Sequence, residues 1–203
     1  MAEMNYAFAL FKWCLPKDKP KAILVLVPGS NGDGRGMVDW DIWQNFANDN
    51  QVALVGCYYQ DIDPSSIEGY TQVNKGSGQA LMNDIRKQGL SKLPILLWGH
   101  SAGGQFNYEF ACWQPTKVIG FIVNKGGYYY TALAPELTRK IPSLWFMGNY
   151  DAYHRRAIIS GLVAMNRSAG AVNWVLKPEN CGHDLGDSIE DSIEFFKEIL
   201  SKL

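Results

Sequence analysis

The sequence predicts a three-layer α/β/α sandwich, in which a mostly parallel central sheet carries helices on both faces. Short runs of apolar, β-branched residues recur along the chain and end at glycine, proline or a polar cluster, as buried strands do. Segments with apolar residues at helical spacing lie between them, and this alternation is typical of parallel sheets. Because the sequence has no internal repeat, low-complexity tract or linker, we expect residues 1–203 to form a single domain.

The first strand is expected at residues 6–15, which alternate loosely, are rich in aromatic side chains and stop at Pro16. This pattern is typical of an edge strand. The run from Ala22 to Val27 is continuously apolar, as in a strand that is covered on both faces. Similar runs predict the remaining strands, at residues 52–57, 95–98, 118–123, 143–147 and 172–176.

Helical spacing of apolar residues predicts the helices that connect and follow these strands. We expect them near residues 38–46, 73–85, 102–113, 158–163 and 187–200. The last one is predicted to begin at Asp187, with Glu190 as its partner in a capping pair. Residues 58–72 form one long polar stretch, which is expected to be irregular and, like many long loops in compact domains, functional.

Composition excludes several classes of protein. The chain is 47% hydrophobic and carries a net charge of −1, so no overall attraction to nucleic acid or to an anionic membrane is expected. No apolar run approaches the roughly 20 residues of a membrane span. The N-terminus lacks the pattern of a signal peptide, so we expect a cytoplasmic protein, or a secreted or periplasmic one if such a peptide has been removed. The four scattered cysteines favour free thiols over one disulfide.

The stretch from Leu93 to Gly104 is the candidate centre of a reactive site. An apolar run of strand length leads into Gly99-His100-Ser101-Ala102-Gly103, and a segment with helix-forming character follows. A Gly-x-Ser-x-Gly turn of this kind pushes the serine out of the backbone, and the flanking glycines remove Cβ atoms that would clash. The N–H groups at the start of the helix would then face the serine, ready for an oxyanion. We therefore interpret Ser101 as a nucleophile.

An acid and a histidine are predicted to lie at the same edge of the sheet, where the carboxyl ends of parallel strands meet. Asp151 follows the strand at 143–147, and His183 follows the last strand. In this chain order of Ser101, Asp151 and His183, the sequence resembles the α/β-hydrolases. The resemblance runs from the strand at Ala22 to the last helix, and it is greatest to small esterase-, lipase- and depolymerase-like members without a large lid.

The resemblance implies a role for each of the three residues. Ser101 would attack, His183 would take its proton, and Asp151 would orient the imidazole and stabilise the imidazolium. The other two histidines have simpler interpretations: His100 as a packed or hydrogen-bonded side chain, and His154 as a solvated or capping one.

The acid has fewer alternatives in this chain than in some relatives. Those relatives take it from the end of the preceding strand, where this chain has Asn124, which carries no charge. Glu179 and Asp184 are so close in sequence to His183 that we interpret them as loop residues. Asp151 is therefore the expected acid.

An oxyanion hole is also implied by the resemblance. It would combine the N–H of Ala102 with an N–H from the first glycine-rich loop. Ser30 is the expected second donor, and Asn31 is a candidate next to it for contact with the substrate. The family often has His-Gly at this loop, whereas this chain has Pro28-Gly29.

Nucleotide and metal binding are disfavoured. Gly29 and Gly34 have the spacing of a phosphate-binding loop, but Arg35 and Gly36 stand where that loop needs Lys and Ser or Thr. Cys181 and His183 have no second Cys/His cluster to complete a metal site. We expect no cofactor and no metal.

The segment from 124 to 141 is too short for a cap domain, so the site is expected to be open to a small-molecule or polymeric ester. Tyr58 and Tyr128, with Tyr59, Tyr129 and Tyr130, follow predicted strands and are candidates for an aromatic rim around the substrate. The alternative is that several of them simply pack against the sheet. The sequence thus predicts a serine hydrolase acting on carboxylic esters; the alternatives are a thioesterase, amidase or acyltransferase using the same triad, or a binding protein with a disused site.

Overall fold

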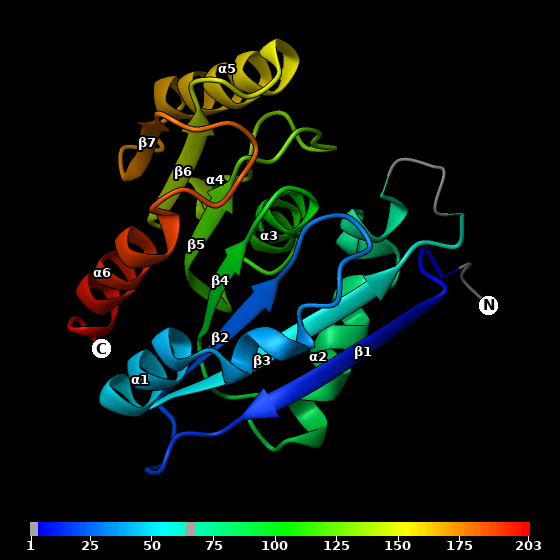
Figure 1. The fold of residues 1–203 in the computed structure, drawn as a ribbon, viewed down its shortest axis with the longest axis vertical. Coiled ribbons are helices and arrows are strands. Elements are labelled where there is room, and N and C mark those ends of the chain that lie inside the picture. The colour runs from blue at the N-terminus through cyan, green and yellow to red at the C-terminus, as the bar shows by residue number, and fades with distance from the viewer. Residues whose placement is uncertain (1–3, 64–67) are drawn as a thin grey trace.

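One sheet organises the molecule (Figure 1). The computed structural model describes residues 4–63 and 68–203. The strands follow the order β1-β3-β2-β4-β5-β6-β7; β1 is antiparallel to β3, and every other neighbouring pair is parallel. The strands are β1 (Phe8–Cys14), β2 (Ala22–Val27), β3 (Val52–Gln60), β4 (Ile95–Gly99), β5 (Val118–Asn124), β6 (Ser143–Gly148) and β7 (Trp174–Glu179).

Helices cover both faces of the sheet, so the predicted three-layer architecture is confirmed (Figure 1). Buried side chains of α1 and α6 pack on one face, and those of α2, α3 and α5 pack on the other. The α-helices are α1 (Asp41–Asn50), α2 (Ser77–Lys87), α3 (Ala102–Trp113), α4 (Glu136–Arg139), α5 (Tyr153–Ser168) and α6 (Ser188–Leu200). Short 3-10 turns form η1 (Arg35–Asp39), η2 (Gly69–Thr71) and η3 (Val73–Lys75).

The central strand β2 shows why the sequence runs that form the inner strands are apolar at every position. Ile23, Val25 and Val27 belong to the core under α2, α3 and α5, whereas Leu24 and Leu26 belong to the core under α1 and α6. Successive side chains of a strand point to opposite faces, so a strand with helices on both sides must be apolar throughout. Within residues 4–63 and 68–203, no helix has the length and apolar character that crossing a membrane would require.

Two strand boundaries differ from the sequence prediction. β3 continues to Gln60 because the antiparallel edge strand pairs with it, Phe8 opposite Gln60, so Tyr58 and Tyr59 are strand residues and not part of an irregular stretch. β7 begins at Trp174 and reaches Glu179, since its register is set by β6; Val172 precedes it in a turn and is 77% exposed. Part of the predicted irregular stretch, residues 64–67, lies outside the described residues.

The starts of two helices, α2 and α6, also differ from the sequence prediction. The helix predicted from residue 73 begins only at Ser77, because Gly76 has a φ of +134° and separates it from η3. At α6, Asp187 is the N-cap residue, but its side chain makes no capping hydrogen bond. Its φ of −92° and ψ of 17° are not the extended conformation from which an N-cap side chain reaches back, so the expected capping pair does not form. All four cysteines are free thiols.

Candidate active site

Ser101 lies in a sharp turn between β4 and α3. Its φ of 53° and ψ of −120° are a conformation that residues other than glycine rarely adopt. The turn has no room for a side chain at its two glycines: a Cβ on Gly99 would lie 2.3 Å from the Gly103 carbonyl oxygen, and one on Gly103 would lie 2.1 Å from that of Val27. The Ser101 N–H donates to the Asn124 carbonyl at 2.7 Å. The elbow predicted from the sequence is therefore present, at the carboxyl edge of the sheet.

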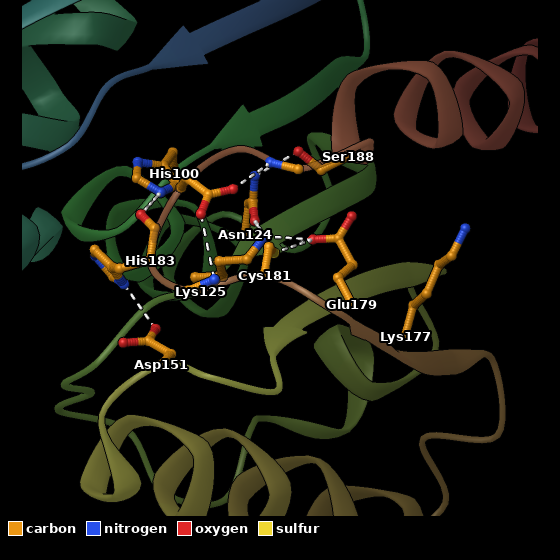
Figure 2. Close-up of polar contacts among 12 residues, drawn as sticks. His100, Asn124, Lys125, Asp151, Lys177, Glu179, Cys181, His183 and Ser188 are labelled. Carbon is orange, nitrogen blue, oxygen red and sulfur yellow. Dashed lines mark hydrogen bonds and ion pairs between the residues drawn. The ribbon is translucent and has the colours of Figure 1, made fainter.

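The three residues that the sequence places at strand ends meet in one line of hydrogen bonds. Ser101 Oγ lies 2.9 Å from His183 Nε2. His183 Nδ1 in turn lies 2.7 Å from Asp151 Oδ2 (Figure 2). A carboxylate only accepts hydrogen bonds, so Nδ1 carries the proton. In the neutral ring Nε2 is then an acceptor, and the serine hydroxyl donates to it. This arrangement can move the serine proton to the imidazole.

The surroundings of the acid fix its orientation. The Asp151 side chain is 5% exposed, whereas that of His183 is 33% exposed, so the base faces solvent and the acid lies behind it. Asp151 Oδ1 accepts the Ala152 N–H at 2.7 Å, and Arg155 Nε lies 3.7 Å from the same oxygen. Hydrogen bonds to both carboxylate oxygens hold the Asp151 side chain against the imidazole.

The predicted oxyanion donors lie on either side of the nucleophile. Ala102 is the first residue of α3, and the positive end of this 12-residue helix is therefore at Ser101. The loop after β2 passes beside the elbow, since a Cβ on Gly29 would lie 3.7 Å from Ser101 Cβ. Ser30, the next residue, is exposed there. The site thus has two backbone segments next to the position of a scissile carbonyl, and their use as oxyanion donors stays a prediction.

The Asn31 side chain is hydrogen-bonded within the protein, and its expected contact with substrate stays a prediction. Its Oδ1 accepts the Asp61 N–H at 2.8 Å, and its Nδ2 donates to Asp61 Oδ2 and Ser30 Oγ, both at 3.3 Å. The backbone N–H of Asn31 donates to the Tyr70 hydroxyl at 3.3 Å. Because these contacts occupy the side chain on both its oxygen and its nitrogen, Asn31 braces the loop beside the nucleophile. Its partners lie far along the chain, which is why the sequence did not indicate this role.

His100 is hydrogen-bonded, as expected, and its partner is the backbone of the His183 loop. Its Nε2 donates to the His183 carbonyl at 3.0 Å. Burial and the neighbouring His183 ring lower the pKa of His100 to about 4, so this ring is neutral at physiological pH. A cavity of about 240 Å³ lies beside it, with apolar walls that include Met37, Trp98 and Leu185.

A buried ion pair lies next to Asn124 and Cys181, and the sequence analysis did not predict it (Figure 2). Lys125 follows β5 with a fully buried side chain, and its Nζ donates to Glu179 Oε2 and, at 3.0 Å, to Asn124 Oδ1. The Glu179 side chain is 8% exposed, so its interpretation as an ordinary loop residue is wrong. The available signal was that both residues follow predicted strands; their charge made them look solvated.

The candidate aromatic rim is only partly present. Tyr128 and Tyr130 are about half exposed on the loop after β5, and the Tyr128 ring lies 6.4 Å from that of His154. Tyr59 is buried in the core. Tyr58 instead packs edge-on against Phe8 of the edge strand. Tyr58 therefore contacts the edge strand, and its expected contact with substrate stays a prediction.

The loop that carries Tyr128 is held by α3. Gln105 Oε1 accepts the N–H groups of Gly127 and Tyr128, at 3.0 and 3.2 Å. One turn further, Glu109 Oε1 accepts those of Tyr130 and Thr131, at 2.8 and 2.9 Å. The segment between β5 and β6 contains a single four-residue helix, α4, so the described part of the chain leaves the triad uncovered on this side. Among the described residues, no group of three or more His, Cys, Asp or Glu side chains is arranged to hold a metal ion.

Comparison with known proteins finds similarity in structure and not in sequence. No protein-family model matches the chain, and no curated protein is significantly similar to it. Solved structures match at 14–18% identity, which supports a shared fold.

Three of these structures cover nearly the whole chain. Acyl-protein thioesterase 2 from Zea mays has a TM-score of 0.66 and 15% identity over 95% of this chain and 100% of its own. LpqC, a poly(3-hydroxybutyrate) depolymerase from Bordetella parapertussis, has a TM-score of 0.70 and 17% identity over 93% and 83%. FphF, a fluorophosphonate-binding serine hydrolase from Staphylococcus aureus, has a TM-score of 0.63 and 15% identity over 98% and 96%. The chain has the α/β-hydrolase fold, which it shares with these structures.

Proposed function

We propose that this chain is a serine hydrolase that cleaves carboxylic ester bonds through an acyl-enzyme intermediate on Ser101. The observation that carries the proposal is the unbroken line from Ser101 Oγ through His183 to Asp151, with distances of 2.9 and 2.7 Å. A strained serine conformation supports it as well, because such strain persists where the surrounding structure enforces it and is concentrated at functional sites.

Acylation begins when Ser101 Oγ attacks the ester carbonyl carbon while its proton passes to His183 Nε2. The carbonyl oxygen becomes an oxyanion, for which the N–H groups of Ala102 and Ser30 are the proposed donors; each such donor contributes about 10²–10³ in rate. Asp151 stabilises the imidazolium without taking its proton. The imidazolium then protonates the leaving alkoxide, the C–O bond breaks, and the alcohol departs.

Deacylation repeats these steps with water as the nucleophile. His183 Nε2 takes a proton from the water, whose oxygen attacks the acyl carbon and forms a second oxyanion. Collapse of this intermediate returns the proton to Ser101 Oγ, breaks the acyl-enzyme bond and releases the carboxylic acid. The cycle consumes one water and needs no cofactor.

The surroundings of the triad favour a small or polymeric ester. The short connection between β5 and β6 leaves the site open, as a polymer chain would require. The cavity of about 240 Å³ beside His100 is bordered by the elbow, the loop after β2 and the His183 loop, and it can take a small apolar group. Because His100 is neutral, this cavity suits an apolar substrate group better than a charged substrate group.

The test is covalent labelling by a fluorophosphonate probe together with hydrolysis of p-nitrophenyl acetate. We expect the wild-type chain to react in both assays, and Ser101→Ala to abolish labelling and lower kcat by at least about 10³. Ser168→Ala, an exposed serine at the end of α5, is the matched control and should react like the wild type. A folded wild-type chain that neither labels nor turns over would instead indicate a binding protein with a disused site.

A further inference from the structure

Lys125 is a buried charge that the proposed reaction does not use. Its side chain is fully buried, and its backbone has a φ of 56°, a conformation that costs a non-glycine residue about 1 kcal/mol or more. Burying an unpaired ammonium group would cost several kcal/mol. Both features therefore need compensation from the surrounding structure.

The compensation comes from the segment that leads to His183. Lys125 Nζ donates to Glu179 Oε2, and the Cys181 thiol lies 3.8 Å from the same oxygen. Gly186 closes over the carboxylate so tightly that a Cβ there would lie 3.1 Å from both Glu179 oxygens. The loop that carries the base is thus seated on the carboxylate of this ion pair.

The same group of residues connects all three members of the triad. The Asn124 carbonyl, next to Lys125, accepts the Ser101 N–H at 2.7 Å. The Glu179 carbonyl accepts the Asn149 N–H at 2.8 Å, two residues before the acid. A shift of the Lys125–Glu179 pair would therefore move the base relative to both the nucleophile and the acid.

We infer that Lys125 and Glu179 are positioning residues that set the place of the His183 imidazole against Ser101 and balance the charge beneath it. The inference rests on the proposed serine hydrolase function. Neither residue touches the reacting atoms; both act through the loop that carries His183. Figure 2 shows the pair in contact with Asn124 and Cys181.

The charges of Lys125 and Glu179 distinguish a positioning role from a purely structural role. The pair is neutral as a whole, but each member alone would act on the imidazolium that forms during the reaction. Without Lys125 the Glu179 carboxylate would favour the imidazolium, and without the Glu179 charge the Lys125 ammonium would disfavour it. The other charged or titratable groups packed around this region remain in place in both cases: His100 of the elbow, Asp151 and Arg155 of the acid segment, and Cys181 and Asp184 of the His183 loop.

The experiment measures the pH dependence of p-nitrophenyl acetate hydrolysis in Lys125→Met and Glu179→Gln. The acid limb of kcat/KM measured for the wild type is the reference for both variants. We expect each variant to lower kcat by about 10–100-fold with KM within about threefold, as a small misplacement of the base would. The acid limb should move to higher pH in Lys125→Met and to lower pH in Glu179→Gln, by about 0.3 pH unit or more.

Lys177→Met is the matched control, because Lys177 lies on the same strand as Glu179 and forms a partly exposed ion pair with Asp191 of α6. Its kcat and pH profile should stay within about twofold of the wild type. Glu179→Gln preserves the shape of the side chain. If Lys125→Met does not fold, this variant decides alone: an acid limb at lower pH than in the wild type supports the inference, and an unmoved limb overturns it. Lowered activity with no opposite movement of the acid limbs, or unchanged activity, would overturn the inference. A wild-type chain that does not react would instead overturn the proposed function.

Discussion

Asn31 illustrates how a single side chain can organise the loop beside the nucleophile. Its φ of 51° lies in the left-handed region, which asparagine tolerates better than most residues. The reciprocal hydrogen bonds with Asp61 hold it there, and burial raises the pKa of the Asp61 carboxyl. The loop that contains Ser30 is therefore held in place before substrate arrives, which is what oxyanion donors require.

We predict that Asn31→Ala lowers kcat by about 10-fold or more and stability by about 1–2 kcal/mol, because it leaves Asp61 short of partners. Steady-state kinetics and urea unfolding measure the two effects. Asn31→Gly separates their causes, since glycine keeps the left-handed backbone but removes the side chain. If Asn31→Gly were as active as the wild type, the hydrogen bonds to Asp61 would not position the loop.

At the residue scale, sequence alone predicts the residues that follow a strand but not the contacts that their side chains make. Ser101, Asp151 and His183 could be predicted because each follows a strand whose position the apolar pattern reveals. Asn31 and Lys125 could not, because their roles depend on partners 30 and 54 positions away. A lysine or an asparagine after a strand has the same local pattern whether it is solvated or buried.

At the scale of elements, the contact between β2, β4 and α3 decides whether the elbow can form. Gly103 is in the first turn of α3 and lies against the backbone at the end of β2. The neighbour in that contact is a carbonyl oxygen of a central strand, which cannot move without disturbing the sheet. The glycine therefore allows the helix to begin directly beside the strand.

We predict that Gly103→Ala destabilises the protein by at least about 3 kcal/mol, since its Cβ would lie 2.1 Å from the Val27 oxygen. Gly161→Ala is the matched control within α5, where a Cβ meets no atom within 4 Å. That change should stabilise by about 0.5–1 kcal/mol, because alanine is the better helix former. Urea denaturation of the two variants measures the difference, and equal effects would contradict the packing argument.

At the scale of the whole molecule, His100, the partly buried histidine of the elbow, couples folding to pH. The pKa of His100 is about 4 in the folded protein and near its ordinary 6.5 in the unfolded chain. Between pH 4 and pH 6.5 the unfolded state binds more protons at His100 than the folded state does. The folded protein is therefore fully stable in this respect above pH 6.5, and its free energy of unfolding falls as the pH falls toward 4. The loss is at most about 3 kcal/mol.

We predict that His100→Gln flattens the fall in stability between pH 6.5 and pH 4, because glutamine does not titrate but can still donate to the His183 carbonyl. Urea unfolding at several pH values, compared between wild type and variant, isolates this contribution from the carboxyl groups that both proteins share. Parallel stability curves for the two proteins would show that His100 is not the group responsible.

The sequence by itself determined the α/β architecture, the elbow turn and the positions of Ser101, Asp151 and His183 after strands of one sheet. It could do so because strands covered on both faces must be apolar throughout, and because the carboxyl ends of parallel strands share one edge. Only the tertiary structure decided the Asn31–Asp61 brace, the Lys125–Glu179 pair, the inward packing of Tyr59 and the extension of β3. These features depend on which distant segments come into contact. That contact decides whether a buried polar group has a hydrogen-bond partner, and the local sequence pattern does not.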